Sequence, residues 1–194
     1  MKRLALLTVT AVLTAVPALA QTWQIDSAHS RAHFAVRHLG ISDIRGDFGR
    51  VTGTVEYDGK DLTKARITAT IDVSSITTRV QKRDEHLKTA DFFDVANHPT
   101  MTFVSTAIAP AGNGRYRMTG NLTMRGVTKP VTLDLVPPAG PVTDHQGTVK
   151  IGAAASGTIN RKDFGVNYHQ VLPDGTLGVA DLIQIQIDVE LIGK

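Results

Sequence analysis

The sequence predicts an all-β protein of antiparallel strands that is interrupted by one short helical insert. Apolar and polar residues alternate with a period of two in one segment after another, as in strands that bury a single face. Turns rich in glycine separate these segments at regular intervals. We count about eight or nine such segments, a number typical of a β-sandwich or a closed barrel.

Three strand-like segments precede the insert. Residues 46–57 and 65–76 both alternate, and the pair Asp58-Gly59 between them has turn chemistry. The first segment, residues 30–39, places four residues on one face: Ala32, Phe34, Val36 and His38. We therefore expect these four side chains to point the same way, into the protein.

Residues 79–105 break the alternation. Val80 and Leu87 lie seven positions apart with charged residues between them, which is the spacing of a short amphipathic helix. Two adjacent phenylalanines follow, Phe92 and Phe93. Because a helix inserted into an all-β chain must cover something, we expect it to cap one mouth of a barrel, with both phenylalanines turned towards an apolar interior.

The second half of the chain returns to strands. Residues 100–109 and 115–124 form a predicted hairpin around Gly112-Asn113-Gly114, and a turn at 125–126 leads into a strand at 131–135.

Proline and glycine at 137–141 then predict a loop, which is followed by strands at 147–159 and 183–191. Residues 160–180 form the longest segment that is neither strand nor helix, and segments of this length are often lids. Small residues on inward-facing positions predict unfilled space inside the sheet: Gly53, Ala69, Ala153 and Ala155.

Residues 1–20 have the pattern of a secretory signal peptide. A basic start precedes an apolar run at 4–16, and the small-residue cleavage pattern Ala18-Leu19-Ala20 follows it. The apolar run is too short to span a bilayer comfortably, so we expect cleavage rather than stable membrane insertion. The mature protein would be a single domain at 21–194, located in the periplasm or secreted.

Composition excludes two classes of protein. The chain has no cysteine, so neither disulfides nor a lipidated cysteine can contribute to it. Of 21 Lys and Arg residues, Lys2 and Arg3 belong to the signal; the other 19 face 18 acidic residues, and the formal charge falls from +3 to +1. No basic run with interleaved aromatics occurs, so we expect no nucleic-acid partner.

An ordered set of motifs covers almost all of residues 21–194. The set comprises Ile25-Asp26-Ser27-Ala28-His29-Ser30, Phe34-Ala35-Val36-Arg37-His38-Leu39-Gly40, Gly46-Asp47-Phe48, Arg83-Asp84-Glu85-His86-Leu87, Asp91-Phe92-Phe93-Asp94, Pro99 with Phe103 and Ser105, Gly120 with Leu122-Thr123, Arg125-Gly126-Val127-Thr128, and Asn160-Arg161-Lys162-Asp163-Phe164-Gly165. In these motifs the chain resembles the YceI-like family of exported polyisoprenoid-binding proteins. Ala28 stands where the family often has proline.

The resemblance implies an antiparallel, eight-stranded, lipocalin-like barrel whose apolar cavity holds a long isoprenoid chain, such as a polyprenyl phosphate or a quinone tail. It also implies a binding protein or carrier with a periplasmic or secreted location, no established catalytic activity and no cofactor. Transport, storage and a role in stress responses all remain open.

Candidate ligand-binding residues fall into two groups. For the apolar tail we expect contacts from Phe34, Val36, Ile71, Phe92, Phe93, Met101, Phe103, Leu122, Phe164 and Ile185. Any one of these side chains could instead simply fill the core. For a polar head we expect Arg83 and His86 on the insert, Arg161 at the start of the long loop, and His38. An ion pair of Arg83 with Asp84, Asp91 or Asp94, and a buried His38 bonded to backbone, are the structural alternatives.

Three further hypotheses carry less support from the sequence. His29 and His33 suggest a metal pair, but four residues of extended strand separate them by roughly 13 Å, so we expect no metal site. A lipid-modifying enzyme acting on a prenyl phosphate is the alternative function, with His86 and a neighbouring carboxylate as acid and base. Exposed strand edges make a homodimer conceivable.

Overall fold

The computed structural model describes residues 21–194, so the predicted signal peptide at 1–20 lies outside the described residues. Within 21–194, no helix has the length and apolar character needed to cross a membrane. The elements are β1 (Gln21–Ile25), β2 (Arg31–His38), β3 (Ser42–Phe48), β4 (Val51–Tyr57), η1 (Leu62–Lys64), β5 (Arg66–Asp72), η2 (Val73–Ser75), β6 (Ile76–Thr77), α1 (Gln81–Lys88), β7 (Thr100–Gly112), β8 (Arg115–Met124), β9 (Val127–Thr143), β10 (Val149–Asn160), η3 (Arg161–Phe164) and β11 (Val179–Gly193).

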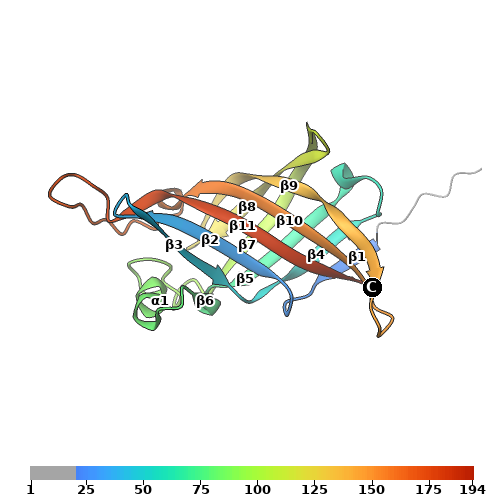
Figure 1. Ribbon diagram of the computed structural model, residues 1–194, viewed down its shortest axis with the longest axis horizontal. Helices are drawn as coiled ribbons and strands as arrows, with labels where there is room; N and C mark the ends of the chain where they lie inside the picture. The colour runs from blue at the N-terminus through green and yellow to red at the C-terminus, as the bar shows by residue number, and fades with distance from the viewer. Residues whose placement is uncertain (1–20) are drawn as a thin grey trace, which may run out of the picture.

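The strands form one closed antiparallel barrel (Figure 1). Neighbouring strands run in the order β1-β4-β5-β7-β8-β9-β10-β11, and β1 pairs back onto β11. β1 and β2 both pair with β11, but along different parts of it: β1 pairs with residues 191–193 and β2 with residues 179–188. The two strands therefore occupy a single position in the barrel. β3 and β4 share one position in the same way, which confirms an eight-stranded barrel rather than a sandwich.

The break between β1 and β2 has a local cause. The carboxylate of Asp26 accepts a hydrogen bond from the backbone N–H of Ala28 at 3.0 Å, which turns the chain over two residues. Ser30 then re-enters the sheet fully buried and accepts a hydrogen bond from the N–H of Glu190. The chain can therefore turn between β1 and β2 while both strands stay paired with β11.

At one end of the barrel the wall is open between β3 and β5, and the insert fills this opening. β5 ends at Asp72, η2 follows, and β6 pairs with only the last two residues of β3. α1 lies beside these strands at this end (Figure 1). Arg125, in the β8–β9 turn, donates to the carbonyl oxygens of Ala90 and Phe92 and so ties the insert to the opposite wall. The predicted helical insert is confirmed, although Val80 precedes the helix and is half-exposed.

Three strand predictions need correction. The strand predicted at 65–76 ends at Asp72 and is followed by η2 and β6. The predicted strand at 46–57 is two strands, β3 and β4, and β3 begins earlier, at Ser42. The predicted loop at 137–141 is part of β9. The prolines fit there because the register between β9 and β10 shifts twice, so that three residues of β9 oppose two of β10 around 137–138 and again around 140–141. At such bulges a residue without an N–H costs no ladder hydrogen bond.

Candidate functional site

The barrel encloses an apolar cavity with two adjoining chambers. The deep chamber and the outer chamber, which lies nearer α1, each have a cavity volume of about 140 Å³, so both are narrow. Four side chains line both chambers and mark their junction: Ile71, Leu122, Ile185 and Ile187.

Small residues keep the deep chamber open. Ala69, Ala153 and Ala155 line it, as the alternation predicts, together with Ala154. Gly53 does not line it and serves a different purpose. A Cβ at Gly53 would lie 2.1 Å from the carbonyl oxygen of Thr68, so only glycine allows β4 and β5 to approach this closely.

Two phenylalanine rings lie against glycines instead of filling the lumen. Phe34 of β2 is paired with Gly46 of β3, where an added Cβ would come within 2.5 Å of the ring. Phe103 of β7 covers Gly120 of β8 in the same manner, at 2.3 Å. Each glycine therefore provides room for an aromatic ring against the wall that a larger residue would displace towards the chamber.

A third, more polar pocket adjoins the outer chamber at the α1 end, and we call it the mouth. It has a cavity volume of about 200 Å³ and shares five apolar residues with the outer chamber: Phe34, Val36, Leu87, Phe92 and Val179. Its polar lining comes from six residues: His38, Thr78, Arg83, His86, Tyr168 and Gln170. No Asp or Glu is among the described residues that line it, so no carboxylate of the lining would repel an anionic head group.

Thr78 fixes the guanidinium of Arg83. Arg83 Nε donates to the Thr78 hydroxyl at 2.7 Å, and Nη2 donates to the Thr78 carbonyl oxygen at 3.0 Å. The hydroxyl of Thr78 in turn donates to Asp84, which also accepts from the Thr78 N–H at 2.7 Å. Arg83 thus reaches Asp84 through Thr78 and makes no direct ion pair within residues 21–194; Nη1 is left without a protein acceptor there.

His86 lies between a carboxylate and two aromatic rings. Its Nε2 is 2.8 Å from Asp91 Oδ2. The imidazole meets the rings of Phe92 and Tyr168 edge-on, at centroid distances of 5.1 and 5.4 Å, and these two rings stack on each other at 4.7 Å. Tyr168 belongs to the long loop after η3, so this aromatic group joins the insert to the loop across the mouth.

Most of the residues predicted for ligand binding come together along the cavity. The outer chamber has Phe34, Val36, Phe92, Phe93 and Met101; the deep chamber has Phe103; the junction has Ile71, Leu122 and Ile185; and the mouth has His38, Arg83 and His86. Phe164 lies elsewhere: it is 1% exposed and lines none of these pockets. That these residues contact a ligand stays a prediction.

Arg161 differs from the expectation of a free guanidinium at the mouth. Its side chain is buried, touches the wall of the outer chamber, and is engaged by four acceptors. Nε donates to Ala180 O at 3.0 Å, Nη1 to Val166 O at 2.7 Å, and Nη2 to Val179 O and Asp181 Oδ1 at 3.3 and 3.0 Å. Arg161 therefore holds the two ends of the long loop together.

Three polar residues of the mouth were missed from the sequence: Thr78, Tyr168 and Gln170. Tyr168 and Gln170 belong to the segment 160–180, whose length alone predicted a lid. Thr78 carried no signal, because its role depends on the side chains of Arg83 and Asp84 folding back onto it.

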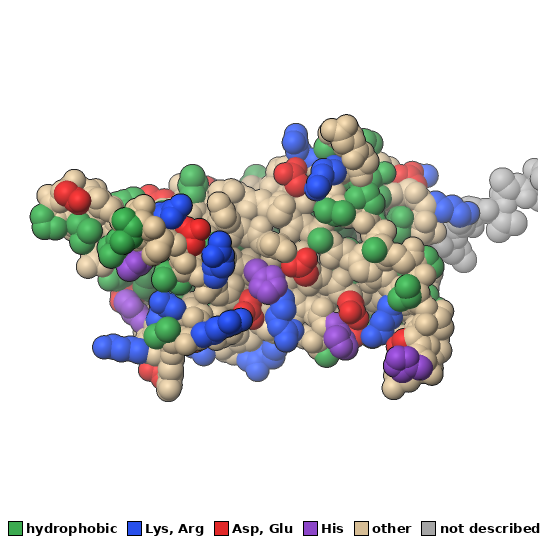
Figure 2. Space-filling model, in the orientation of Figure 1, with side chains coloured by type: hydrophobic (Ala, Val, Ile, Leu, Met, Phe, Trp, Pro, Cys, Tyr) green, Lys and Arg blue, Asp and Glu red, His purple; other side chains and the backbone are tan. Residues whose placement is uncertain are grey.

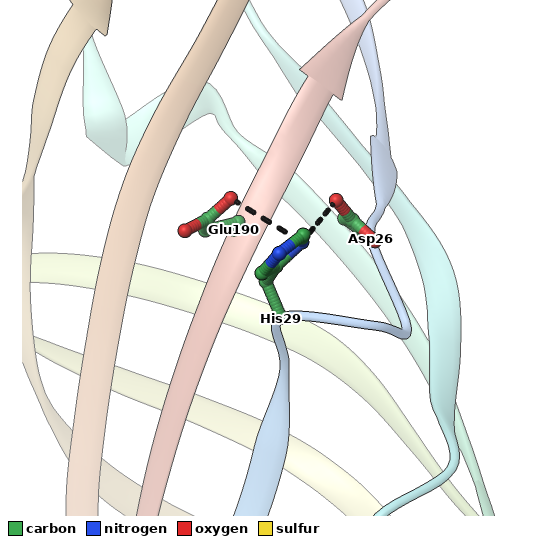
Figure 3. A group of neighbouring side chains, drawn as sticks. All are labelled: Asp26, His29 and Glu190. Carbon is green, nitrogen blue, oxygen red and sulfur yellow. Dashed lines mark hydrogen bonds and ion pairs between the residues drawn. The ribbon is translucent and has the colours of Figure 1, made fainter.

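At the far end of the barrel, Asp26, His29 and Glu190 lie together (Figure 3). His29 Nδ1 is 2.8 Å from Asp26 and 3.8 Å from Glu190. Three groups of this kind could in principle hold a metal ion, but the ammonium group of Lys150 lies 3.5 Å from Asp26 and 3.4 Å from Glu190. The carboxylates already have a counter-ion, so we interpret the group as a clasp between the β1–β2 turn and the last strands.

We expect Asp26→Asn to lower the free energy of unfolding by about 1.5 to 3 kcal/mol at pH 7, the usual range for hydrogen bonds to a charged group. The hydrogen bond from His29 holds the pKa of Asp26 below its ordinary value, aided by the N–H of Ala28. The stabilisation is therefore present above about pH 4 and lost as pH falls through the pKa of the folded state. Urea unfolding of wild type and variant between pH 7 and pH 3 should show the two stabilities converging; a constant difference would contradict this assignment.

Comparison with known proteins agrees with this architecture. Residues 23–191 match the YceI-like domain family. A UPF0312 protein of Pectobacterium atrosepticum is 37% identical over 191 residues, covering 97% of this chain and 92% of the relative. The crystal structure of BcnA from Burkholderia cenocepacia superposes with a TM-score of 0.73 at 27% identity, over 86% of this chain and 98% of that one.

A polyisoprenoid-binding domain from Saccharophagus degradans shares the fold, with a TM-score of 0.65 at 14% identity over 91% of this chain and 99% of that one. The family match spans nearly all of the described residues and all the strands that form the cavity. This chain is therefore a member of the YceI-like family of barrel proteins.

Proposed function

We propose that the protein is an exported carrier that holds one long-chain isoprenoid lipid, a polyprenyl phosphate or a quinone-like molecule, in the barrel. The observation that carries this proposal is the pair of narrow, adjoining apolar chambers, with a polar pocket next to the outer one. Export is supported by the signal pattern at 1–20. The polyisoprenoid-binding domain of S. degradans, which has the same fold, supports the ligand class.

The dimensions of the cavity suit one thin, extended tail. Ile183 lines the outer chamber and Leu191 the deep chamber, and eight residues of strand separate them, roughly 26 Å at about 3.3 Å per residue. An isoprene unit has five carbons, so each buried unit contributes about 3 to 4 kcal/mol before the costs of association. Affinity should therefore rise with chain length until both chambers are filled.

Native mass spectrometry of protein purified from its own cells, followed by organic extraction and lipid analysis, tests the proposal. A single bound prenyl species would support a carrier and identify its head group. Protein that is empty, and that also fails to take up added quinones and prenyl phosphates, would refute the proposal.

The mouth predicts how a charged head would be recognised. Arg83→Gln should lower affinity for a polyprenyl phosphate about tenfold, because a guanidinium makes charge-assisted hydrogen bonds to phosphate oxygens. Affinity for the uncharged prenol of the same length should change less than twofold. Displacement of a fluorescent long-chain probe measures both affinities. The control is Arg79→Gln, an exposed position four residues earlier that lines no pocket; an equal loss for both lipids in Arg83→Gln would assign Arg83 a structural role.

One observation favours a second candidate, an enzyme acting on a prenyl phosphate. The contact of His86 with Asp91 at 2.8 Å resembles the pairing that orients an imidazole for proton transfer. This function requires turnover of a prenyl phosphate that disappears in His86→Ala while binding persists. Incubation of the protein with a radiolabelled polyprenyl phosphate, with recovery of unchanged lipid, would leave the carrier function as the only one of the two.

A further inference from the structure

The mouth is surrounded by apolar side chains that protrude into solvent. Ile41, in the turn between β2 and β3, is 79% exposed, more than any other large apolar side chain in residues 21–194. Val171, in the loop after η3, is 48% exposed, and Val80, just before α1, is 47% exposed. We call these three residues the rim. Exposed apolar side chains at the tips of neighbouring loops are typical of surfaces that meet another apolar phase.

The three rim residues come from separate segments that the fold brings to the same end. The turn at 39–41 packs on the long loop: Leu39 N donates to Gly178 O at 3.1 Å, and a Cβ on Gly40 would contact Thr176. In Figure 1 this turn, the long loop and α1 all lie at one end of the barrel. Figure 2 shows hydrophobic side chains gathered at that end, with Lys and Arg groups beside them.

Basic side chains flank the rim on the α1 side. Arg79, Lys82 and Lys88 make no ion pair with any residue in 21–194. Arg83 and Asp84 are joined through Thr78, so their charges offset each other. Glu85 is then the only other carboxylate of α1 that can balance these three cations. Free cations beside exposed apolar groups complement an anionic lipid surface, where each cation strengthens binding about fivefold.

We propose that the mouth end of the barrel docks on an anionic phospholipid bilayer, with the rim in the head-group region and the basic residues of α1 against lipid phosphates. The inference rests on the proposed function, since a cargo this apolar moves between protein and bilayer most readily when the mouth faces the bilayer. Docking in this orientation places the polar mouth pocket between the bilayer and the outer chamber.

Asp174 sets the depth of this contact. It lies in the turn of the long loop that the hydrogen bond from Gly175 N to Leu172 O closes. Its carboxylate accepts a hydrogen bond from the N–H of Thr176 at 2.9 Å, and this bond holds the pKa of Asp174 below its ordinary value. A carboxylate that stays ionised prevents the loop from entering the hydrocarbon. The rim therefore binds at the surface and reversibly, as a carrier that must detach requires.

Sedimentation with vesicles tests the proposal, using protein purified from cells that express the full chain. The vesicles are phosphatidylethanolamine and phosphatidylglycerol at 3:1, compared with phosphatidylcholine alone, in about 0.1 M salt. The double variant Ile41→Ser/Val171→Ser should lower the partition coefficient on the anionic vesicles at least tenfold. The matched control is Val142→Ser/Val149→Ser, at exposed positions of the β9–β10 hairpin at the opposite end, which should change it less than twofold.

A charge variant tests the other half of the surface. The partition coefficient of Arg79→Gln/Lys82→Gln on anionic vesicles should fall about 25-fold, at fivefold per cation removed. Its partition coefficient on phosphatidylcholine should not change. Docking is overturned if the wild type fails to sediment, if the control variant loses as much as the rim variant, or if uptake of a prenyl probe from vesicles is unchanged in the rim variant.

Probe binding in vesicle-free solution separates this proposal from the proposed function. All four proteins should bind the probe equally, because none of the substituted residues lines the cavity. Normal probe binding without sedimentation would refute docking and leave the carrier function intact. Sedimentation without probe binding would refute the carrier function and support docking of the rim.

Discussion

Replacement of Leu122 with tryptophan should reduce affinity for a long isoprenoid at least a hundredfold and leave a one-unit or two-unit ligand bound within threefold of wild type. Leu122 lines both chambers at their junction, and the larger ring would occupy the space between them. A ligand that enters from the mouth would then reach only the outer chamber. Each excluded isoprene unit forfeits about 3 to 4 kcal/mol of apolar burial before costs, so the loss should appear abruptly with chain length.

Titration with prenols of increasing length measures this cutoff. The added ring fills empty space, so the free energy of unfolding should change by less than about 1 kcal/mol, below the cost of overfilling a close-packed core. Val104→Trp provides the control, since Val104 is half-exposed on the neighbouring strand β7 and lines neither chamber. Long ligands that bind Leu122→Trp as tightly as wild type would mean that the two chambers are not occupied by one chain.

Arg161→Ala should be the most destabilising single substitution among the polar residues of the mouth end, at about 3 to 5 kcal/mol. It leaves Asp181 without its buried partner and removes the donor for three backbone carbonyls, those of Val166, Val179 and Ala180. For a chain of this size the melting temperature should fall by roughly 10 °C. The long loop should also become sensitive to protease, because both of its ends lose their tie.

Lys162→Ala isolates the contribution of burial. Lys162 pairs with the same carboxylate of Asp181 at 2.9 Å, but its side chain is 36% exposed, so its removal should cost less than about 1 kcal/mol. Thermal and urea unfolding of both variants supply the comparison. If Arg161→Ala were as stable as wild type and lost only affinity for prenyl phosphates, Arg161 would contact the ligand, as the sequence suggested, and the structural role would be rejected.

Alternation predicted the inner face of most strands because a period of two leaves no freedom once one residue is known to be buried. Phe34, Val36 and Ile185 were placed correctly on the cavity side for this reason. The split between β3 and β4 could not be read from the sequence. It depends on β2 and β1 occupying different lengths of β11, which is a property of pairings distant in the chain.

The roles of several site residues could not be predicted from the sequence for the same reason. Gly46 and Gly120 have no visible partner in the sequence, and their role as seats for Phe34 and Phe103 follows only from strand pairing. Arg161 appeared to be a surface charge beside a loop, because its acceptors lie 5 to 20 residues further along the chain. Side-chain chemistry thus predicted the kind of site, while long-range pairing decided which residues supply it.

The pairing of β1 with β11 also governs how the chain can fold. Trp23 lies opposite Gly193, so the ring closes between the two ends of the described chain. This contact spans almost the entire domain, and the entropy of closing such a long loop must be overcome before the ring forms. β1 can pair with β4 early, but the other edge of β1 stays unpaired until β11 has been synthesised and has folded against it.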